Sequence, residues 1–201
     1  MTPVSQQILL GSASPRRKAL LAGLDSPFTV VAIDADESYP ADLKGGDIPC
    51  YISRAKAQAY ADRLMPDQLL ITADTIVWLE DQMLGKPHDD AEAVAMLRLL
   101  SGKTHQVYTA VTFAEKSPAV NSESQVVLST LVDKTDVTFA ELTDEQIRYY
   151  VLKYRPLDKA GAYGVQEWIG YVACTHMDGS YFNVMGFPVH LVYGELKRRG
   201  F

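Results

Sequence analysis

QILLGSASPRRKALL, residues 7–21, joins an apolar run to a helix through a loop of small residues. The apolar run QILL (7–10) predicts a short buried strand. Ser14 is placed to cap the helix, and Pro15 occupies the first helical position, where its missing N–H costs nothing. We expect this helix to run to about Leu21. A strand, a small-residue loop and a helix N-terminus together favour anion binding, because unpaired N–H groups point outward and the helix dipole attracts negative charge.

Arg16 and Arg17 place two positive charges in the first turn of that helix. Guanidinium groups bind phosphate oxygens in a bidentate manner. Under the simpler interpretation Ser14 is only a cap and the arginines are solvated at the surface. Cations in a first turn oppose the helix dipole, however, and this unfavourable placement favours a functional interpretation. The stretch is therefore predicted to hold phosphate.

The first half of the chain continues with alternating strand and helix patterns. Residues 28–33 predict a strand, and residues 47–64 have apolar side chains at helical spacing, which places Lys56 on a helix. Residues 68–74 form a continuous apolar run that ends in Asp74, as in a central strand buried on both faces. Residues 89–102 predict an amphipathic helix with acids in its first turn and a glycine beyond its end.

The second half begins with alternating residues, 105–113 and 124–142, which predict an antiparallel hairpin. Residues 143–151 open with Thr143 and Gln146, the spacing of a capping box at a helix start. In residues 171–186 the Asp178-Gly179 pair predicts a turn between two strands. Residues 187–200 predict a terminal helix with Pro188 near its start.

The interleaved pattern indicates a mixed α/β protein with one mixed sheet and flanking helices. We expect an elongated sheet with a central cleft. No break in composition divides the chain, so residues 1–201 are predicted to form a single domain, either undivided or in two lobes.

Composition excludes several classes of protein. The 201 residues carry a net charge of -6, which disfavours a broad basic face. The sequence also lacks an aromatic-basic pattern, so neither an RNA-binding module nor any other nucleic-acid partner is expected. No apolar run reaches the ~20 residues of a membrane span, and the opening residues lack the pattern of a signal peptide, so a cytoplasmic location without membrane association is expected. Cys50 and Cys174 are predicted to be reduced thiols, and the four histidines are too dispersed for a metal site.

Asp74 is the second candidate functional group, because the carboxyl end of a buried strand is where open α/β sheets place ligand-binding side chains. Thr75 beside it is able to bond a base or a phosphate. Asp74 alternatively caps a turn. We rank this alternative lower because TADTIVWL (72–79) is apolar on both sides of the acid, and an acid within such a run requires a reason.

Two loops offer further polar groups. Lys86 lies between Gly85 and Pro87, although loop lysines are more often simply solvated. The segment PLDKAGAYGVQ (156–166) combines glycines with Asp158, Lys159 and Gln166, which together offer a charge pair and an amide able to read a base edge. It is equally compatible with an irregular connection. SGKTH (101–105) resembles the end of a P-loop but lacks the required upstream glycine and strand, so Gly102 is interpreted as a helix C-cap.

These segments occur together in a recognisable order. SASPRRKALL, ISRAKAQA, TADTIV, GKP, AVAMLRLLSGKTHQVYTAV, DVTF and PLDKAGAYGVQ span nearly the whole chain, and in this combination the sequence resembles the Maf family of nucleotide pyrophosphatases. Ala73-Asp74-Thr75 and the segment 159–166 resemble the branch of that family that acts on dTTP and UTP. The branch that acts on 7-methyl-GTP typically has Ser-Asp-Gln at the position of Ala73-Asp74-Thr75.

The resemblance implies a fold like that of the inosine triphosphate pyrophosphatases, a homodimer, and metal-dependent hydrolysis of a nucleoside triphosphate to the monophosphate and pyrophosphate. It implies that Asp74 is the proton acceptor and that Glu37, one of three acids within DADES (34–38), joins it at a Mg²⁺ or Mn²⁺ ion. The substrate-binding positions that it implies are Ser12, Arg16, Arg17, Lys56, Thr75, Lys86 and Gln166.

The residue inventory agrees with that reaction, because cleavage at the α-phosphorus needs neutralised phosphate charge and an activated water. We expect dTTP and UTP to be preferred. The alternatives are a pyrophosphatase for 7-methyl-GTP or another modified nucleotide, and a regulator that binds a nucleotide without hydrolysing it. The intact Asp74 argues against the regulator.

Overall fold

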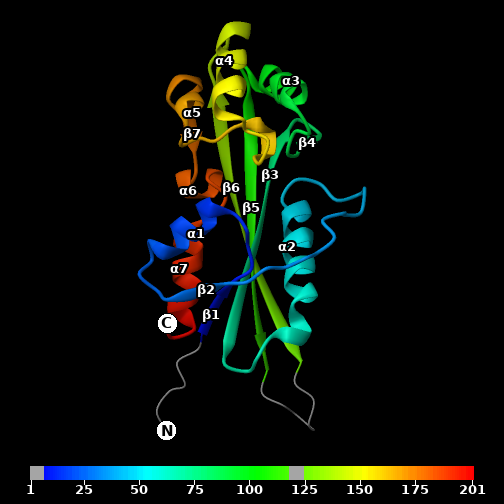
Figure 1. Cartoon of the computed structure of the whole chain (residues 1–201), viewed down its shortest axis with the longest axis vertical. Helices are drawn as coiled ribbons and strands as arrows, with labels where there is room; N and C mark the ends of the chain where they lie inside the picture. Colours follow the sequence, from blue (N-terminus) through cyan, green and yellow to red (C-terminus); the bar gives the residue numbers. More distant parts are fainter. Residues whose placement is uncertain (1–6, 118–124) are drawn as a thin grey trace. The chain divides into compact units, whose positions relative to one another are not determined.

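The computed structural model describes residues 7–117 and 125–201. Its helices and strands follow one another as labelled in Figure 1. In chain order they are β1 (Gln7–Leu10), α1 (Pro15–Ala22), β2 (Phe28–Val30), α2 (Asp47–Ala59), the 3-10 turn η1 (Ala61–Arg63), β3 (Gln68–Leu79), β4 (Gln82–Leu84), α3 (Asp90–Leu100), β5 (Thr104–Lys116), β6 (Val126–Phe139), α4 (Asp144–Tyr154), the 3-10 turn η2 (Ala160–Ala162), α5 (Trp168–Ala173), β7 (Cys174–Asp178), α6 (Tyr181–Val184) and α7 (Val189–Arg198).

The strands form one mixed sheet in the order β2-β1-β3-β5-β6-β7, with β4 paired to β3. β1 is parallel to both β2 and β3, whereas β4 and β7 are antiparallel to β3 and β6. Hydrogen bonds join Thr104 to Thr138 and Thr112 to Thr130, so residue numbers fall on β6 as they rise on β5 and the two strands are antiparallel. The predicted mixed α/β architecture is confirmed, and so is the antiparallel pairing of the two middle strands.

The chain forms two compact units, and β3, β5 and β6 each contribute residues to both. The first unit comprises residues 1–74, 109–132 and 186–201, and the second comprises residues 75–108 and 133–185.

Helices cover both faces of the sheet portion in the first unit (Figure 1). Ile8 and Leu10 of β1 pack in one apolar cluster with Leu21 of α1 and Leu196 of α7. Leu9 packs in a second cluster that contains Ala57 of α2. Successive residues of a strand point to opposite faces, so a run that is apolar at every position is buried on both sides.

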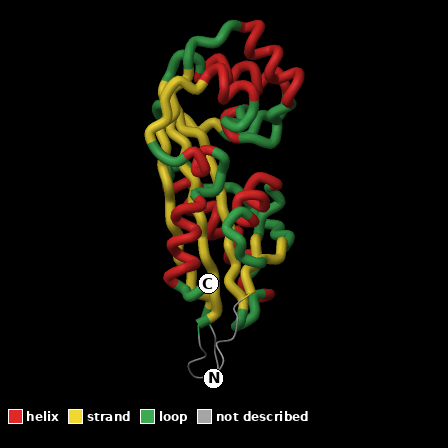
Figure 2. Tube along the Cα trace, turned by 90° about the vertical axis from the view of Figure 1, so that its left-hand side faces the viewer, coloured by secondary structure: helices red, strands yellow, loops and turns green. Residues whose placement is uncertain are grey.

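The second unit has a single apolar core. Its strands contribute Val77, Val107 and Phe139, and α3 and α4 contribute residues such as Leu97 and Tyr150. In Figure 2 most of the helical segments of this unit lie to one side of its strands. Among the described residues, no helix is long and apolar enough to cross a membrane.

The helix boundaries agree closely with the sequence patterns. Ser14 caps α1 with Pro15 at its first position, and Thr143 and Gln146 form both bonds of a capping box at α4. Gly102 follows the end of α3 with φ +68, the left-handed conformation that a glycine adopts without strain.

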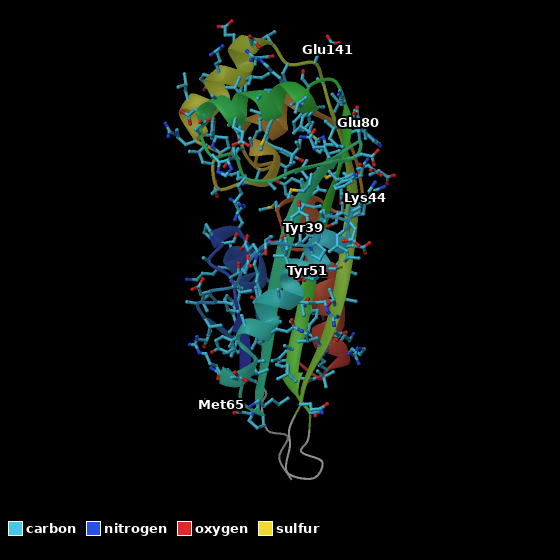
Figure 3. The ribbon with its side chains drawn as sticks, turned by 90° about the vertical axis from the view of Figure 1, so that its right-hand side faces the viewer. Tyr39, Lys44, Tyr51, Met65, Glu80 and Glu141 are labelled. Atoms are coloured by element: carbon cyan, nitrogen blue, oxygen red, sulfur yellow. The ribbon has the colours of Figure 1, made fainter. Side chains whose placement is uncertain are left out.

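The strand predicted over residues 68–74 is too short. β3 continues through Asp74 to Leu79, where a turn at Glu80, labelled in Figure 3, leads into β4. The polar residues Asp74 and Thr75 interrupt the apolar pattern without ending the strand, because the backbone bonds of a sheet do not depend on side-chain polarity. Asp74 therefore lies within a strand, and not at its carboxyl end.

Three further predictions need correction. The residues after Asp178-Gly179 form helix α6 and not a second strand, because Ser180 caps that helix by accepting a bond from Asn183 N. The strand predicted over residues 28–33 ends at Val30. The helix predicted over residues 47–64 ends at Ala59 and is followed by η1.

Candidate active site

The loop after β1 lies beside the residues that lead to Asp74. Because β1 and β3 are parallel and Leu10 pairs with Ile71, the chain beyond Leu10 runs alongside residues 72–74. Gly11 N donates to Ile71 O at 2.8 Å. A Cβ at Gly11 would lie 2.3 Å from Cδ1 of Ile33, so only glycine fits here without a shift. Strand pairing thus places the N-terminus of α1 next to the candidate catalytic acid.

The N-terminus of α1 has the features of an anion site. Ser14 Oγ accepts from Arg17 N at 3.4 Å, and the first turn contains no acidic residue. Ser12 Oγ accepts a second backbone bond, from Ser14 N at 3.2 Å. The remaining N–H groups and the dipole of the helix favour a negatively charged ligand.

Arg17 is tied to backbone carbonyls on both sides of this loop. Its Nε donates to Gly186 O and its Nη1 to Ala73 O, each at 2.8 Å. Burial lowers the pKa of the Arg17 guanidinium, and the nearby charge of Asp74 opposes that shift. The group remains a cation at neutral pH. Arg17 therefore fixes the backbone immediately before Asp74 and also adds positive charge beside it.

Lys56 lies between Asp74 and Glu37, the two acids predicted to hold a metal. Its Nζ is 2.8 Å from Asp74 Oδ1 and 3.0 Å from Glu37 Oε1. Tyr51 of the same helix, labelled in Figure 3, is exposed, whereas the side chains of Lys56 and Asp74 are only 14% and 13% exposed. Helix α2 thus directs one lysine toward the sheet, where it holds a carboxylate in a fixed orientation.

The carboxylates of Asp74 and Glu37 suit a metal ion that binds together with a substrate. Within residues 7–117 and 125–201, no group of three or more His, Cys, Asp and Glu side chains is arranged to hold a metal ion. Asp74 and Glu37 nevertheless bring two carboxylates to one Lys56 Nζ. Mg²⁺ is commonly bound by one or two carboxylates plus substrate phosphates, so these residues fit that ion.

The second unit holds the other predicted substrate-binding residues, Thr75, Lys86 and Gln166. Thr75 follows Asp74 in β3 and is half-buried, and Lys86 is exposed in the loop after β4. Gln166 Oε1 is buried, and no described group donates a hydrogen bond to it. Because an unpaired buried acceptor is costly, this oxygen indicates a place for a ligand donor.

Within the first unit the structure brings Ser12, Arg17, Lys56, Glu37 and Asp74 into one set. Arg17 Nη1 is 3.4 Å from Ser12 Oγ and bonds the carbonyl of Ala73, the residue before Asp74. Lys56 Nζ contacts Asp74 and also Glu37. Arg16 is half-buried at the start of α1. The predicted charge pair in the loop 156–166 is present, since Lys159 Nζ is 2.8 Å from Asp158 Oδ1.

Sequence reasoning missed Tyr150 and Glu167. Tyr150 OH donates to a Glu167 carboxylate oxygen, and Glu167 Oε1 is 3.0 Å from Lys159 Nζ. Burial raises the pKa of the Tyr150 hydroxyl, and its bond to Glu167 raises it further. Glu167 directly follows Gln166. Its position next to a candidate base-reading amide was the one sequence signal that could have identified it as a functional residue. Tyr150 gave none, because it occupies an ordinary apolar position of a helix.

The remaining predictions concern cysteine and histidine. Cys50 and Cys174 are both free thiols. His105 is buried, and its Nε2 is 2.8 Å from Tyr163 OH. This histidine belongs to a packed core, as expected of a histidine without metal-binding spacing.

Comparison with known proteins gives matches over most of the chain. A family model described as Maf-like protein matches residues 7–199. The "dTTP/UTP pyrophosphatase" of Bacteroides thetaiotaomicron is 53% identical over 193 residues, covering 96% of this chain and 95% of its own. Proteins of the same name from Porphyromonas gingivalis strain W83 and Flavobacterium psychrophilum are 51% and 43% identical, covering 96% and 93% of this chain and 94% and 91% of their own.

Solved structures give weaker likenesses. The Ham1 protein of Staphylococcus aureus aligns over 94% of this chain and 100% of its own with a TM-score of 0.45 and 15% identity. A nucleoside-triphosphatase / dITP/XTP pyrophosphatase from Mycobacterium abscessus aligns over 66% of this chain and 74% of its own with a TM-score of 0.32 and 17% identity. At this level of overlap, the relationship to known proteins rests on the sequence matches.

Proposed function

This chain belongs to the Maf-like protein family, and on that premise we propose that it hydrolyses dTTP and UTP to the nucleoside monophosphate and pyrophosphate. The observation that carries the proposal is the Lys56 ammonium held between Asp74 and Glu37 beside the N-terminus of α1. This arrangement places a proton acceptor and a cation beside a helix terminus that is suited to bind phosphate. The substrate named for the curated relatives is the same.

Phosphate binding is assigned to the positive end of α1 and to nearby cations. The N–H groups of α1 and the guanidinium of Arg16 meet phosphate oxygens, while Ser12 offers a hydroxyl. Lys56 lies close enough to Asp74 to contact the phosphate that reacts there. Lys86, which is exposed in the loop after β4, is assigned to phosphate binding because the family resemblance implies that role. Arg17 contributes charge and holds Ala73 in place.

Asp74 is assigned the role of proton acceptor and water orienter. One of its oxygens is held by Lys56 Nζ at 2.8 Å, which leaves the other to accept a proton from a water molecule. Lys56 keeps the carboxylate oriented, and it then neutralises charge that develops on the phosphate. The strand environment limits rotation of the acid, so the water is presented in one direction.

A divalent cation is assigned to Asp74 and Glu37. When bound, Mg²⁺ or Mn²⁺ supplies charge neutralisation on the phosphates and makes a coordinated water more acidic. Lys56 contacts both acids, so its ammonium keeps the two carboxylates together before the substrate arrives.

Gln166 and Thr75 are assigned to base recognition. Uracil and thymine both present an N3–H donor, which the unpaired Oε1 of Gln166 is suited to accept. Cytosine has an acceptor at the same ring position, and pairing it with Oε1 would place two acceptors face to face. A site built to hydrogen-bond one edge rejects bases that leave its buried polar groups unpaired. The methyl group of thymine lies away from that edge, which is consistent with acceptance of both bases.

The family resemblance also implies a homodimer, and we extend the proposal to that assembly. Light scattering on the purified full chain tests it. A mass near twice the 22.2 kDa of one chain is expected, and a mass of one chain at all concentrations would contradict it.

Release of pyrophosphate from dTTP, UTP, CTP, ATP, GTP and 7-methyl-GTP, with Mg²⁺ or Mn²⁺, tests the activity. We expect turnover of dTTP and UTP, and a loss of roughly 100-fold or more in Asp74→Asn, because an amide cannot accept the proton. Asp62→Asn, the same change at an exposed site in η1, serves as the matched control.

Other outcomes lead to different functions. Preferential turnover of 7-methyl-GTP would keep Asp74 in its role but contradict the roles of Thr75 and Gln166. Nucleotide binding without turnover would place the protein among regulators. Near-native turnover by Asp74→Asn at saturating metal would refute the proposed proton acceptor.

A further inference from the structure

Gln166 lies in a tight turn whose two ends bond to each other. Glu167 N donates to Gly164 O at 2.9 Å, which closes the turn over residues 164–167. The side chain of Gln166 leaves this turn with Oε1 buried and unpaired. The direction of that oxygen therefore depends on how firmly the turn is held.

Tyr150 of α4 joins both ends of the turn through one hydroxyl group. Its oxygen accepts from Gly164 N at 3.0 Å, and its proton is donated to Glu167 Oε2. The ring is fully buried in the core of the second unit. Because burial and Glu167 raise the pKa of this hydroxyl, it keeps the proton that it donates.

Lys159 holds the other carboxylate oxygen of Glu167. Its Nζ lies 3.0 Å from Glu167 Oε1 and 2.8 Å from Asp158 Oδ1, and its side chain is only 9% exposed. With one oxygen bonded to Tyr150 and the other to Lys159, the Glu167 carboxylate cannot rotate without losing a bond. A lysine this buried is normally found only where it is paired.

Close packing also restricts the turn. A Cβ at Gly164 would lie 2.8 Å from Nε2 of Gln166 and 3.0 Å from Cε of Lys159, so the Gln166 amide lies directly over the Gly164 backbone. A Cβ at Gly170 of α5 would lie 1.8 Å from Val165 O. The turn is thus fixed by hydrogen bonds at its ends and by close backbone packing in its middle.

We propose that Tyr150, Glu167 and Lys159 are positioning residues that hold the 164–167 turn and thereby set the selectivity of Gln166 for the N3–H edge of uracil and thymine. This inference rests on the proposed function, because it concerns the base that the same site selects. None of the three residues contacts substrate in the mechanism above. They act through the direction of one amide oxygen, so they affect which base is accepted more than how fast the phosphate is cleaved.

Tyr150→Phe tests the inference, because it removes only the hydroxyl that joins the two ends of the turn. The ratio of kcat/KM for UTP to that for CTP is expected to fall roughly 10-fold to 100-fold, mainly through a higher KM for UTP. Tyr149→Phe is the matched control, since it removes a hydroxyl at the neighbouring position of α4 that accepts a hydrogen bond from Nζ of the exposed Lys153 at 2.7 Å. The control is expected to keep the native ratio. A purely structural role for Tyr150 would lower activity on UTP and CTP together and leave the ratio unchanged, and that result would overturn the inference.

Glu167→Gln and the double variant with Tyr150→Phe show whether the two residues act as one network. Residues that work through the same turn are non-additive, so the double variant is expected to lose no more selectivity than the more impaired single variant. Independent losses that multiply would contradict a shared network.

Hydrogen exchange at the Gly164 amide in nucleotide-free protein separates this inference from the proposed function. Exchange is expected to be faster in Tyr150→Phe than in the native chain or in Tyr149→Phe, because the amide loses its acceptor. Unchanged exchange would overturn the network whatever the substrate. If the native enzyme showed no preference for UTP over CTP, the proposed base selection would be refuted, and with it the role of the three residues in selectivity. Faster exchange in Tyr150→Phe would then still support the hydrogen-bonded turn.

Discussion

At the scale of single residues, the position of Lys56 decides what Asp74 can do. An isolated carboxylate in a mostly apolar strand would be costly to bury. The ammonium at 2.8 Å offsets that cost, and the second contact with Glu37 at 3.0 Å links the acid to a residue 37 positions earlier in the chain. One lysine therefore joins three segments that are far apart in sequence.

Lys56→Gln is expected to lower kcat/KM for UTP by roughly 100-fold, because it removes a cation from both the acid and the phosphate. Pyrophosphate release at saturating Mg²⁺ measures the loss. Lys18→Gln, at an exposed position of α1, is the matched control and is expected to retain native activity. If Lys56→Gln kept activity within about threefold of the native value, Lys56 would have only a structural role.

At the scale of elements, each part of the site depends on how one helix or strand begins or pairs. The capping box at α4 sets the start of the helix that carries Tyr150, and the parallel pairing of β1 with β3 sets the loop before α1. The capping box was predicted from Thr143 and Gln146, because its bonds are local. The extension of β3 past Asp74 was not, because it depends on neighbouring strands and on the turn to β4.

Thr143→Ala is expected to lower the free energy of unfolding by about 1 kcal/mol, because Gln146 N loses the side-chain acceptor that lies 3.2 Å away. Thermal unfolding checks this, with an expected decrease of about 2–4 °C. Thr143→Ser keeps the hydroxyl and is expected to remain close to native. An equal loss in both variants would show that the methyl group of Thr143, and not its cap, stabilises α4.

At the scale of the whole molecule, the two compact units share strands β3, β5 and β6, so the chain enters each unit more than once. A buried group in either unit therefore affects the stability of strands that run through both units. His105 in β5 is such a group, since it packs edge-on against Phe139 and Tyr163.

Burial lowers the pKa of His105 to about 4, although the charge of Asp136 opposes the shift. The unfolded chain has a histidine pKa of ~6.5, so on acidification it takes up a proton that the folded protein does not. Stability that is complete above pH ~6.5 is therefore expected to fall by up to about 3 kcal/mol as the pH approaches 4.

Denaturant unfolding followed by tryptophan fluorescence at several pH values measures this loss, because Trp78 and Trp168 both belong to the unit that contains His105. His105→Gln removes the titrating group, and its stability is expected to depend less steeply on pH over this range. The same pH dependence in the variant and the native chain would show that other groups cause the acid sensitivity.

The sequence alone determined the features that depend on near neighbours. The cap at Ser14, the capping box at Thr143, the left-handed glycine after α3 and the doubly buried strands follow from local hydrogen bonds and from side-chain period. The family also follows from the sequence, because its motifs occur in order along the chain.

Only the tertiary structure decided which polar groups meet. Lys56 contacts Glu37 and Asp74, Arg17 bonds the carbonyls of Ala73 and Gly186, and Tyr150 bonds the turn around Gln166. These partners lie 14 to 169 positions apart, as with Tyr150 and Gly164 or Arg17 and Gly186. Side-chain contacts at such separations arise from strand pairing and helix packing, and no local pattern in the sequence encodes them.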